Sequence, residues 1–474
     1  MPRTVFDIST LSRWSGPPVG IVRTERELAR WTKTDLPSAV FAFFDPLEGR
    51  YREVKAEWLD AIIDGKVSVF PIEVPSATGR RRRRDRIPRR LQPTVMALPH
   101  LRRTLLLRLD EIWRLAESQT TKAVVEKLQQ VLMTDKYRRL FFEPNGSRRT
   151  AVRYGSIVGD PIDLQSVDIL ITVGAGWEHH DIEVLRRLKT QTQFRLVTMC
   201  YDLMPLLFPQ FYQPRDVAAF RKHFHRMFPT ADLVVVSSHA VEQDVITYCR
   251  DHLLQLNRTE VVSLGVDPGK PSLPREGKLP PGIAPNHFAL LVSTIEPRKG
   301  HRLMYEVWLR LLAEGVPQRT EFKLVFVGRP GWMVDDLMRR LKSDPRLAGT
   351  MHILSFASDD ELAALYKATA FCVYPSVYEG YGLPIVEAFA RGKAVLASNG
   401  GALAETVGDL SPCLDPYDQE LWYNTMKRWI LEPSARAPYE AAIRARFRPR
   451  SWRETTATLL QLIGSLDSTC EYSP

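Results

Sequence analysis

The stretch Glu379-Gly-Tyr-Gly-Leu-Pro-Ile-Val-Glu387 decides the expected fold, because it joins an apolar run to the start of a helix. The apolar run before it, Ala370-Phe-Cys-Val-Tyr-Pro375, predicts a buried strand. Gly380 and Gly382 permit a tight turn with the backbone close to a ligand, and Pro384 suits the first turn of a helix. A strand, a glycine turn and a helix in this order predict one unit of a parallel α/β sheet.

Two carboxylates bracket this turn and suggest a ligand. Glu379 precedes the helix and Glu387 lies about one turn inside it. Carboxylates can accept hydrogen bonds from sugar hydroxyls, while the free N–H groups of the helix start face a phosphate. Strand–helix junctions with a glutamate are also common as plain structure, so this stretch alone leaves both interpretations open.

Two further loops follow expected strand ends in the same half of the chain. Glu296-Pro-Arg-Lys-Gly300 contains Arg298 and Lys299, which offer cationic donors to phosphate oxygens, although such a turn is also typical of a solvated loop. Gly400-Gly-Ala-Leu-Ala-Glu405 permits close approach of the backbone. Because parallel strands end at one edge of a sheet, we expect all three loops at that edge.

Outward from these loops, apolar runs alternate with helical spacing along most of the chain. We expect strands at 4–8, 38–44, 167–173, 194–200, 233–237, 288–293, 322–328, 351–354, 370–375 and 394–398, with helices between them, including 21–31 and 182–188. Ser358-Asp-Asp-Glu361 predicts a capping box. The alternation predicts an α/β protein with two doubly wound domains and a cleft between them.

Proline and glycine mark the expected domain boundary. The segment from Asp267 to Gly282 is dense in both, so we expect a first domain at 1–268 and a second at 285–447. Residues 448–474 are expected to form a final helical segment. Residues 72–150 interrupt the alternation with basic and helical sequence, which predicts an insertion that packs on the first domain or offers a face to a membrane surface.

The charge balance favours partners that carry negative charge. The 474 residues contain 65 Lys and Arg against 55 Asp and Glu, a formal charge of +10. Eight arginines fall within residues 80–90. This run is either a solvated loop or a contact with anionic headgroups, which would stabilise binding by about 1 kcal/mol per basic side chain. Nucleic acid is not expected, because no aromatic-interleaved basic groove accompanies the run.

Cysteine usage and hydropathy favour a cytoplasmic protein. Peripheral association with the inner face of the membrane is an alternative that they leave open. The five cysteines are scattered and never spaced C-x-x-C, which argues against a disulfide framework or a zinc site. Neither a signal peptide nor a spanning apolar run is expected. Trp177-Glu-His-His180 resembles a metal cluster but lacks further ligand spacing, and no D-x-D tripeptide occurs, so we expect neither a metal nor another cofactor.

Taken together, the motifs resemble the retaining GT-B glycosyltransferases of family GT4, a group with many bacterial mannosyltransferases. The resemblance rests on the following residues: Ser293-Thr-Ile-Glu-Pro-Arg-Lys-Gly300, Phe326-Val-Gly328, Ser358-Asp-Asp-Glu-Leu362, Glu379 with Glu387, Gly400-Gly401 with Glu405, and Ser451-Trp452. It is specific over about 288–465, looser over 1–45 and 165–270, and absent over 72–150. It implies the GT-B fold, in which two Rossmann-like domains face a cleft and the final helix, here 448–474, crosses back to the first domain.

The resemblance also implies roles in the second domain. Glu387 would hold the donor ribose, and Arg298 and Lys299 would neutralise the diphosphate. The donor sugar would be held by Glu379 and the backbone of Gly380, Tyr381, Gly382 and Leu383, and the base would be flanked by residues around Gly328 and Phe356. Some branches carry Gly-Arg where this chain has Val292-Ser293, which leaves the phosphate charge to the two cations.

In the first domain the resemblance is weaker. Gly20-Ile-Val-Arg23 resembles the first strand–helix loop of the family, so Gly20 would approach the diphosphate and Arg23 the acceptor. Cys200-Tyr-Asp-Leu-Met-Pro205 resembles an H-D-x-x-P segment in which Tyr201 replaces His. Asp202 would orient the acceptor hydroxyl or the transferred sugar, or else cap a strand end.

The implied activity is that of a hexosyltransferase. A sugar, mannose by family frequency, would move with retention from a nucleotide-sugar donor such as GDP-mannose to a saccharide or lipid-linked glycan in bacterial polysaccharide or lipopolysaccharide synthesis. Two alternatives remain: a GT-B-fold nucleotide-sugar epimerase, and a non-catalytic protein that binds sugar nucleotides.

Overall fold

The computed structural model describes residues 3–14, 20–69, 104–113, 115–132, 149–266 and 279–468. The arginine run at 80–90 and most of the expected linker lie outside these residues. The chain divides into two compact units, unit 1 with residues 1–33 and 37–194, and unit 2 with residues 34–36 and 195–474. Unit 2 therefore includes residues 195–266, which the sequence assigns to a first domain ending at 268. The predicted boundary between 268 and 285 stays a prediction.

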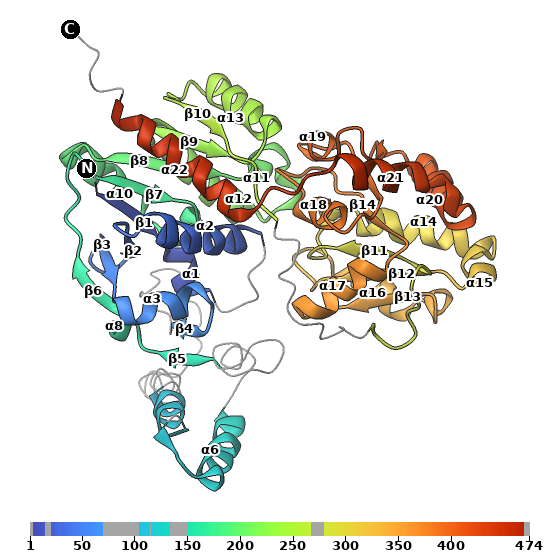
Figure 1. Cartoon of the computed structure of the whole chain (residues 1–474), viewed down its shortest axis with the longest axis horizontal. Helices are drawn as coiled ribbons and strands as arrows, with labels where there is room; N and C mark the ends of the chain where they lie inside the picture. The colour runs from blue at the N-terminus through green and yellow to red at the C-terminus, as the bar shows by residue number, and fades with distance from the viewer. Residues whose placement is uncertain are drawn as a thin grey trace, which may run out of the picture. The chain divides into compact units, whose positions relative to one another are not determined.

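Unit 2 is built around a six-stranded parallel sheet (Figure 1). Its strands, in chain order, are β11 (Phe288–Val292), β12 (Lys323–Val327), β13 (Met351–Leu354), β14 (Phe371–Tyr374), β15 (Val395–Ser398) and β16 (Cys413–Leu414). The spatial order is β13-β12-β11-β14-β15-β16, and every neighbouring pair is parallel. The order reverses between β11 and β14, which is the switch point where doubly wound sheets bind ligands.

Helices cover this sheet and bury its apolar strands. They are α14 (His301–Ala313), α15 (Val316–Thr320), α16 (Asp335–Ser343), α17 (Asp359–Ala368), α18 (Leu383–Phe389), α19 (Leu403–Val407), α20 (Gln419–Leu431) and α21 (Ala437–Arg446). Trp308 on α14 and Trp422 on α20 are fully buried in the core. The predicted capping box begins α17, where the Ser358 hydroxyl accepts from the Glu361 amide and the Glu361 carboxylate accepts from the Ser358 amide.

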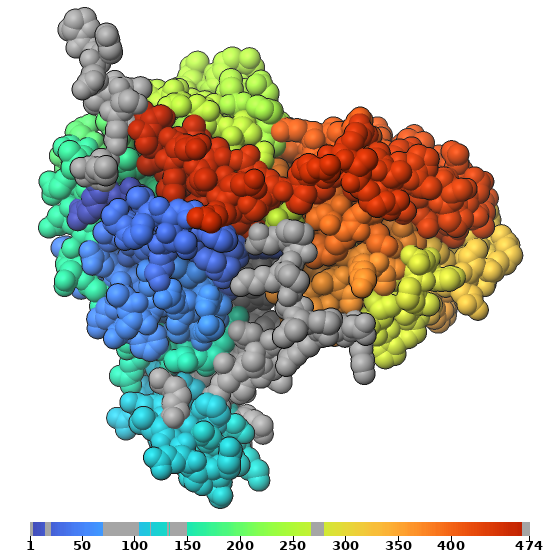
Figure 2. All heavy atoms as spheres, in the orientation of Figure 1, coloured from blue at the N-terminus to red at the C-terminus, as the bar shows by residue number. Residues whose placement is uncertain are grey.

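Three more parallel strands belong to unit 2, β8 (Arg195–Cys200), β9 (Leu233–Val236) and β10 (Thr259–Val261). Their helices are α11 (Met204–Leu207), α12 (Pro214–Thr230) and α13 (His239–Asp251). The final helix, α22 (Trp452–Ser468), contacts the segment after β10, because Thr455 Oγ1 donates to the Ser263 carbonyl at 2.9 Å. Its opposite face is exposed, as the dark red surface in Figure 2 shows.

Unit 1 contains a sheet in which β1 (Thr4–Asp7) lies between β7 (Ile169–Thr172) and β2 (Val40–Asp45), all parallel. Two antiparallel strands, β3 (Arg50–Val54) and β6 (Val158–Pro161), extend it, and β4 (Val67–Val69) pairs with β5 (Thr150–Val152). The helices of unit 1 are α1 (Ser9–Arg13), α2 (Ile21–Asp35), α3 (Ala56–Ile63), α6 (Gln119–Leu132), α8 (Tyr154–Ile157), α9 (Gly176–His179) and α10 (Ile182–Thr192).

The described part of the 72–150 segment is helical at 104–113 and in α6, in keeping with the expected helical character. Among the described residues, no helix is both long enough and apolar enough to span a bilayer.

Candidate functional site

The candidate site lies at the carboxyl edge of the six-stranded sheet, at the switch point between β11 and β14. The loop after β11 forms the short 3₁₀ helix η2 (Pro297–Lys299), and the loop after β14 leads into α18. The Val377 amide donates to the Arg298 carbonyl at 2.7 Å, and the Ala402 amide donates to the Glu379 carbonyl at 2.9 Å. The three loops that the sequence predicts at one edge therefore contact one another.

Two cations and two glutamates form an ion cluster at this edge. Lys299 Nζ lies 2.6 Å from Glu379 Oε1, and Arg298 Nη1 lies 3.1 Å from Glu379 Oε2. Arg298 Nε also lies 3.3 Å from Glu296 Oε2. Arg298 Nη1 donates to the Tyr378 carbonyl at 3.2 Å. The side chains of these four charged residues are 8–12% exposed, so the cluster is almost wholly removed from water.

Burial and pairing together set the protonation of this cluster. Burial alone would raise the pKa of Glu379, but Lys299 and Arg298 lower it to about 2, so this carboxylate stays ionised. Burial lowers the pKa of Lys299, and the neighbouring Arg298 lowers it further against the pull of Glu379. The pKa of Arg298 is raised, because Glu379 and Glu296 outweigh the effect of its burial. Glu379 is thus a fixed anion held between two cations.

Asp202 adds a third carboxyl near the cluster. It follows β8, and its Oδ1 accepts from the Met204 amide at 3.0 Å in the turn before α11, while its predicted role toward the acceptor stays a prediction. Burial raises the pKa of Asp202, and Arg298 opposes that rise. Burial likewise raises the pKa of Glu296 against the effect of Arg298 and Lys299. Both groups therefore accept a proton more readily than ordinary carboxylates, which limits the negative charge beside the cations.

Glu387 lies on α18, just beyond the ion cluster in sequence. Its side chain is buried, and Oε2 accepts a hydrogen bond from the Tyr366 hydroxyl at 2.9 Å. Tyr366 and Tyr374 line one small cavity together with Pro384, at the start of α18. Tyr374 in turn accepts from Lys299 Nζ at 3.4 Å. Through these two tyrosines, the structure connects Glu387 to the same strand-end region as the two cations.

The glycine turn is held by close backbone contacts. A Cβ on Gly380 would lie 2.0 Å from the Tyr201 carbonyl oxygen, so no larger residue fits there without displacing backbone. The Gly380 carbonyl accepts from the hydroxyls of Ser237 at 2.8 Å and Ser238 at 2.9 Å. Gly382 has a φ of +104° and precedes Leu383, the first residue of α18. The predicted close approach of backbone at this turn is therefore present within the protein itself.

The remaining predicted residues lie at neighbouring positions. The Tyr381 hydroxyl donates to the Leu264 carbonyl at 2.9 Å, so its side chain points away from α18 toward the segment after β10. Gly328 follows β12, and a Cβ there would lie 1.8 Å from the Ser293 carbonyl oxygen. Phe356 follows β13 and is exposed. Their role beside a base stays a prediction.

Gly20 and Arg23 belong to unit 1, where they lie at the start of α2. The Gly20 carbonyl accepts from the Thr24 amide at 3.0 Å, and the Arg23 side chain is half-buried. The predicted contacts of these residues with donor and acceptor stay predictions.

Several site residues were not predicted. Tyr366 and Tyr374 lie within a helix and a strand, where their spacing indicates only core positions. Ser237 is the last residue of the predicted strand 233–237 and Ser238 follows it, and this place at a strand end was their one available signal. Glu296 is part of the predicted loop Glu296-Pro-Arg-Lys-Gly300. Its pairing with Arg298 depends on the turn geometry of η2, which the sequence pattern does not specify.

In the 177–180 segment, the side chain of His180 pairs with a buried carboxylate. His180 Nε2 lies 2.7 Å from Asp7 Oδ2, and both side chains are buried in unit 1. Ser9 also donates to Asp7, from its amide at 2.9 Å. Within the described ranges, no group of three or more His, Cys, Asp or Glu residues has an arrangement that could hold a metal ion.

Several known glycosyltransferases are similar to this chain. Residues 283–446 match the family described as "Glycosyl transferases group 1". The chain is 30% identical over 270 residues to O-antigen chain mannosyltransferase B of Escherichia coli, covering 55% of this chain and 68% of that protein. It is 34% identical over 193 residues to the MMP alpha-(1->4)-mannosyltransferase of Mycolicibacterium hassiacum, covering 41% and 42%. It is 26% identical to the E. coli mannosyltransferase WbdA but spans 36% of its length.

A solved structure matches nearly the whole chain. It is the Anabaena protein Alr3699/HepE in complex with UDP and glucose, with a TM-score of 0.58 and 15% identity, covering 98% of this chain and 100% of that one. At this identity the match concerns the fold alone, and it confirms the GT-B fold class predicted from the sequence.

Proposed function

The chain belongs to the group 1 glycosyl transferases, and from this premise we propose that it transfers mannose from GDP-mannose to a saccharide acceptor with retention of configuration. One observation carries the proposal: Arg298, Lys299 and Glu379 form a buried ion cluster at the switch point of the sheet, beside the start of the helix that carries Glu387. The choice of mannose follows the names of the relatives in Escherichia coli and Mycolicibacterium hassiacum.

The cluster suits a ligand with a sugar at one end and phosphates at the other. In the free protein Glu379 pairs with both cations, and its single negative charge leaves them with a net positive charge. We propose that donor binding brings the diphosphate to Arg298 and Lys299, while Glu379 accepts hydrogen bonds from sugar hydroxyls. Arg298 Nε and Glu296 Oε2 are buried and lie 3.3 Å apart as an ion pair, but neither atom makes a hydrogen bond among the described residues. Buried polar atoms of this kind are costly, and a bound ligand can satisfy them.

The proposed reaction depends on stabilising the leaving group. As the glycosidic bond to phosphate breaks, negative charge grows on the leaving diphosphate, next to two cations that are already fixed in a dry site. In the proposed mechanism the leaving phosphate accepts the proton of the acceptor hydroxyl on the same face of the sugar. Asp202 then orients that hydroxyl or the transferred sugar, and Glu387 holds the ribose.

A screen of nucleotide sugars tests the donor. Binding to the folded state raises the melting temperature in proportion to ln(1 + [L]/Kd), so the true donor is the one with the largest shift among GDP-, UDP- and dTDP-sugars at equal concentration. We expect GDP-mannose to stand out, and transfer to require a saccharide acceptor. Conversion of the donor without any acceptor would instead identify an epimerase, and binding without turnover in any mixture would identify a non-catalytic protein.

The proposed chemistry requires no divalent metal, because Arg298 and Lys299 carry the charge that a metal would otherwise supply. The absence of a D-x-D tripeptide motivates this expectation. We predict that EDTA leaves the initial rate of mannose transfer unchanged. Loss of transfer on adding EDTA, with recovery on adding Mg²⁺ or Mn²⁺, would contradict it.

We further propose that the acceptor is a lipid-linked or growing bacterial polysaccharide, handled by a cytoplasmic enzyme at the inner face of the membrane. The eight arginines within 80–90 support contact with anionic headgroups. Co-sedimentation with vesicles containing phosphatidylglycerol, compared with purely zwitterionic vesicles, tests this contact. Binding that vanishes when the eight arginines are replaced by serine supports it, and equal binding of both proteins contradicts it.

A further inference from the structure

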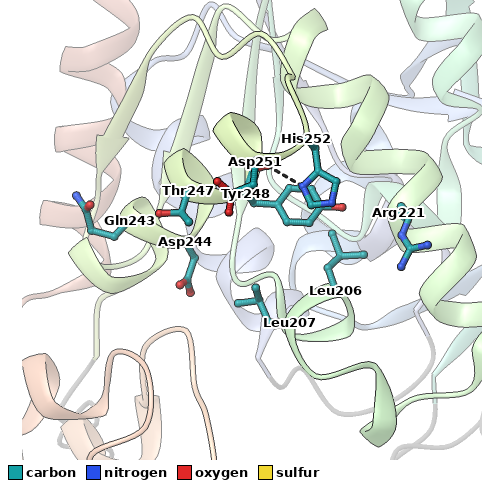
Figure 3. Close-up of a pocket in the computed structure, with 9 residues that line it drawn as sticks. All are labelled: Leu206, Leu207, Arg221, Gln243, Asp244, Thr247, Tyr248, Asp251 and His252. Carbon is teal, nitrogen blue, oxygen red and sulfur yellow. Dashed lines mark hydrogen bonds between the residues drawn. The ribbon is translucent and has the colours of Figure 1, made fainter.

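A groove separate from the ion cluster lies between α11, α12 and α13. It has a volume of about 370 Å³, within the range of small-molecule sites. Figure 3 shows its lining residues: Leu206 and Leu207 on α11, Arg221 on α12, Gln243, Asp244, Thr247, Tyr248 and Asp251 on α13, and His252 directly after it. No sequence motif pointed to this groove.

One helix supplies most of the polar groups of the groove. Gln243, Asp244, Thr247 and Asp251 recur at helical spacing along α13, so their side chains lie on one face. Together they offer an amide, two carboxyls and a hydroxyl, while Leu206 and Leu207 provide an apolar surface. Alternating hydrogen-bonding groups and an apolar surface match a neutral sugar, which has hydroxyls at its rim and C–H groups on its faces.

Other ligand classes fit the lining less well. The lining holds two carboxyls, Asp244 and Asp251, and one arginine, Arg221, while Arg250 pairs with Asp251 at 3.1 Å. These charges balance, so no surplus of positive charge is present to hold an anion such as free phosphate. A drug-like apolar ligand would bury several polar groups without partners, which is costly. The lining therefore favours a polar, uncharged ligand.

Part of the groove wall is held in place before any ligand binds. The rings of Tyr248 and His252 stack with centroids 4.0 Å apart, and His252 Nδ1 lies 2.9 Å from the Tyr248 carbonyl oxygen, the dashed contact in Figure 3. The Tyr248 hydroxyl lies 2.7 Å from His225 Nε2 on α12. A preorganised wall reduces the ordering cost of binding.

Short connections join the groove to the ion cluster. The Tyr378 hydroxyl donates to Asp244 Oδ2, and the carbonyl of the same tyrosine accepts from Arg298 at 3.2 Å. Leu206 and Leu207 follow Asp202 by four and five residues. One tyrosine and one short helix therefore bridge the groove and the residues proposed to hold the transferred sugar.

We propose that this groove binds a sugar unit of the acceptor glycan, next to the unit that receives mannose. This assignment rests on the proposed function, because it requires that the chain transfers sugar to a saccharide. It explains why Tyr378 contacts both sites: the tyrosine fixes the groove relative to Arg298 and so sets how far along the acceptor chain the reacting hydroxyl lies.

A paired substitution on α13 tests the groove. Thr247→Trp fills it with a large side chain, whereas Ile246→Trp adds the same side chain at the neighbouring, exposed position outside the lining. Transfer from GDP-mannose is measured with α-methyl mannoside and with α-linked mannobiose, mannotriose and mannotetraose. We expect Thr247→Trp to raise KM for the oligosaccharides about tenfold or more, corresponding to the loss of about 1.4 kcal/mol of binding, and to leave KM for the methyl mannoside unchanged. Ile246→Trp should change neither.

Affinity for GDP, measured on the same samples, separates the two proposals. If the wild type neither binds GDP nor transfers mannose, the proposed function fails. If it binds GDP and transfers mannose but Thr247→Trp keeps the oligosaccharide KM within twofold, the groove assignment alone is overturned. If the wild type binds GDP but transfers mannose to none of these acceptors, the groove assignment is also overturned. Should Thr247→Trp lower the melting temperature strongly, Gln243→Ala replaces it, and the same length-dependent rise in KM is required.

Discussion

At the scale of single residues, the account depends on two buried cations that share one glutamate. Their place beside Glu379 could be predicted from the sequence, because the loops after parallel strands meet at one edge of a sheet. The contacts of Tyr366 and Tyr374 could not be predicted from the sequence. An aromatic residue at a core spacing does not indicate that its hydroxyl contacts a functional carboxylate or amine.

Removing either cation should nearly abolish transfer. Loss of one group that stabilises developing charge typically costs about 10²–10³ in rate, so we predict that reduction in kcat for Arg298→Ala and for Lys299→Ala. Initial rates with saturating GDP-mannose measure it. Arg302→Ala is a matched control, because Arg302 is an exposed arginine on α14 that pairs with Asp336. Near-normal turnover in both cluster variants, with correct folding, would refute the role of these cations.

Donor affinity should fall as pH rises. Burial raises the pKa of Asp202 and of Glu296 above their ordinary values of 3.8 and 4.5. When the pH is below these raised pKa values, both carboxyls are protonated and neutral, so they do not repel the incoming diphosphate. As pH rises through them, both become anions beside the phosphate site. Calorimetric titration of GDP-mannose across this range measures the effect.

Asp202→Asn serves as the control for this pH dependence, since an amide cannot ionise. The variant should show a shallower fall in affinity than the wild type. An affinity for GDP-mannose that stays flat or rises with pH in the wild type would contradict the raised pKa values as the cause.

At the scale of elements, the parallel strands that were predicted match the structure to within about two residues at each end, because they are continuous apolar runs bounded by turn residues. The short parallel strands β4, β5, β10 and β16 were not predicted. The antiparallel strands β3 and β6 escaped prediction. The sequence Arg50-Tyr-Arg-Glu-Val54 alternates polar and apolar side chains over five residues, and its burial depends on neighbours far away in the chain. The strand propensity of these five residues alone does not reveal which distant strands they pair with.

The loop between β14 and α18 depends on the absence of a side chain at Gly380. A methyl group there would lie 2.0 Å from the Tyr201 carbonyl oxygen, and backbone on both sides would have to move. We predict that Gly380→Ala lowers the free energy of unfolding by about 1–3 kcal/mol, as overpacked positions do. Urea unfolding measures this loss.

Gly464 on α22 is the matched control for Gly380, because a Cβ there has no neighbour within 4 Å. Gly464→Ala should be neutral or stabilising by up to about 1 kcal/mol, since alanine is the better helix former. Equal unfolding free energies for the two alanine variants would show that the Gly380 loop has room that the structure does not give it.

At the scale of the whole molecule, the doubly wound order of the six-stranded sheet explains why a site could be predicted at all. Strand order 3-2-1-4-5-6 places the switch point between the first and fourth strands, here β11 and β14, and the motif loops follow these two strands. The composition of the 267–282 segment indicates a boundary that stays a prediction, while the compact units divide before β8. Such a division depends on contacts made across the chain, which local composition does not encode.

The most direct test of the account is a calorimetric titration of GDP-mannose into the wild type, Lys299→Ala and Glu387→Ala under one set of conditions. We predict saturable binding to the wild type and at least about tenfold weaker binding to each variant, because Lys299→Ala loses a phosphate contact and Glu387→Ala loses the contact with the ribose. Identical dissociation constants for all three proteins would place the donor elsewhere and contradict the account.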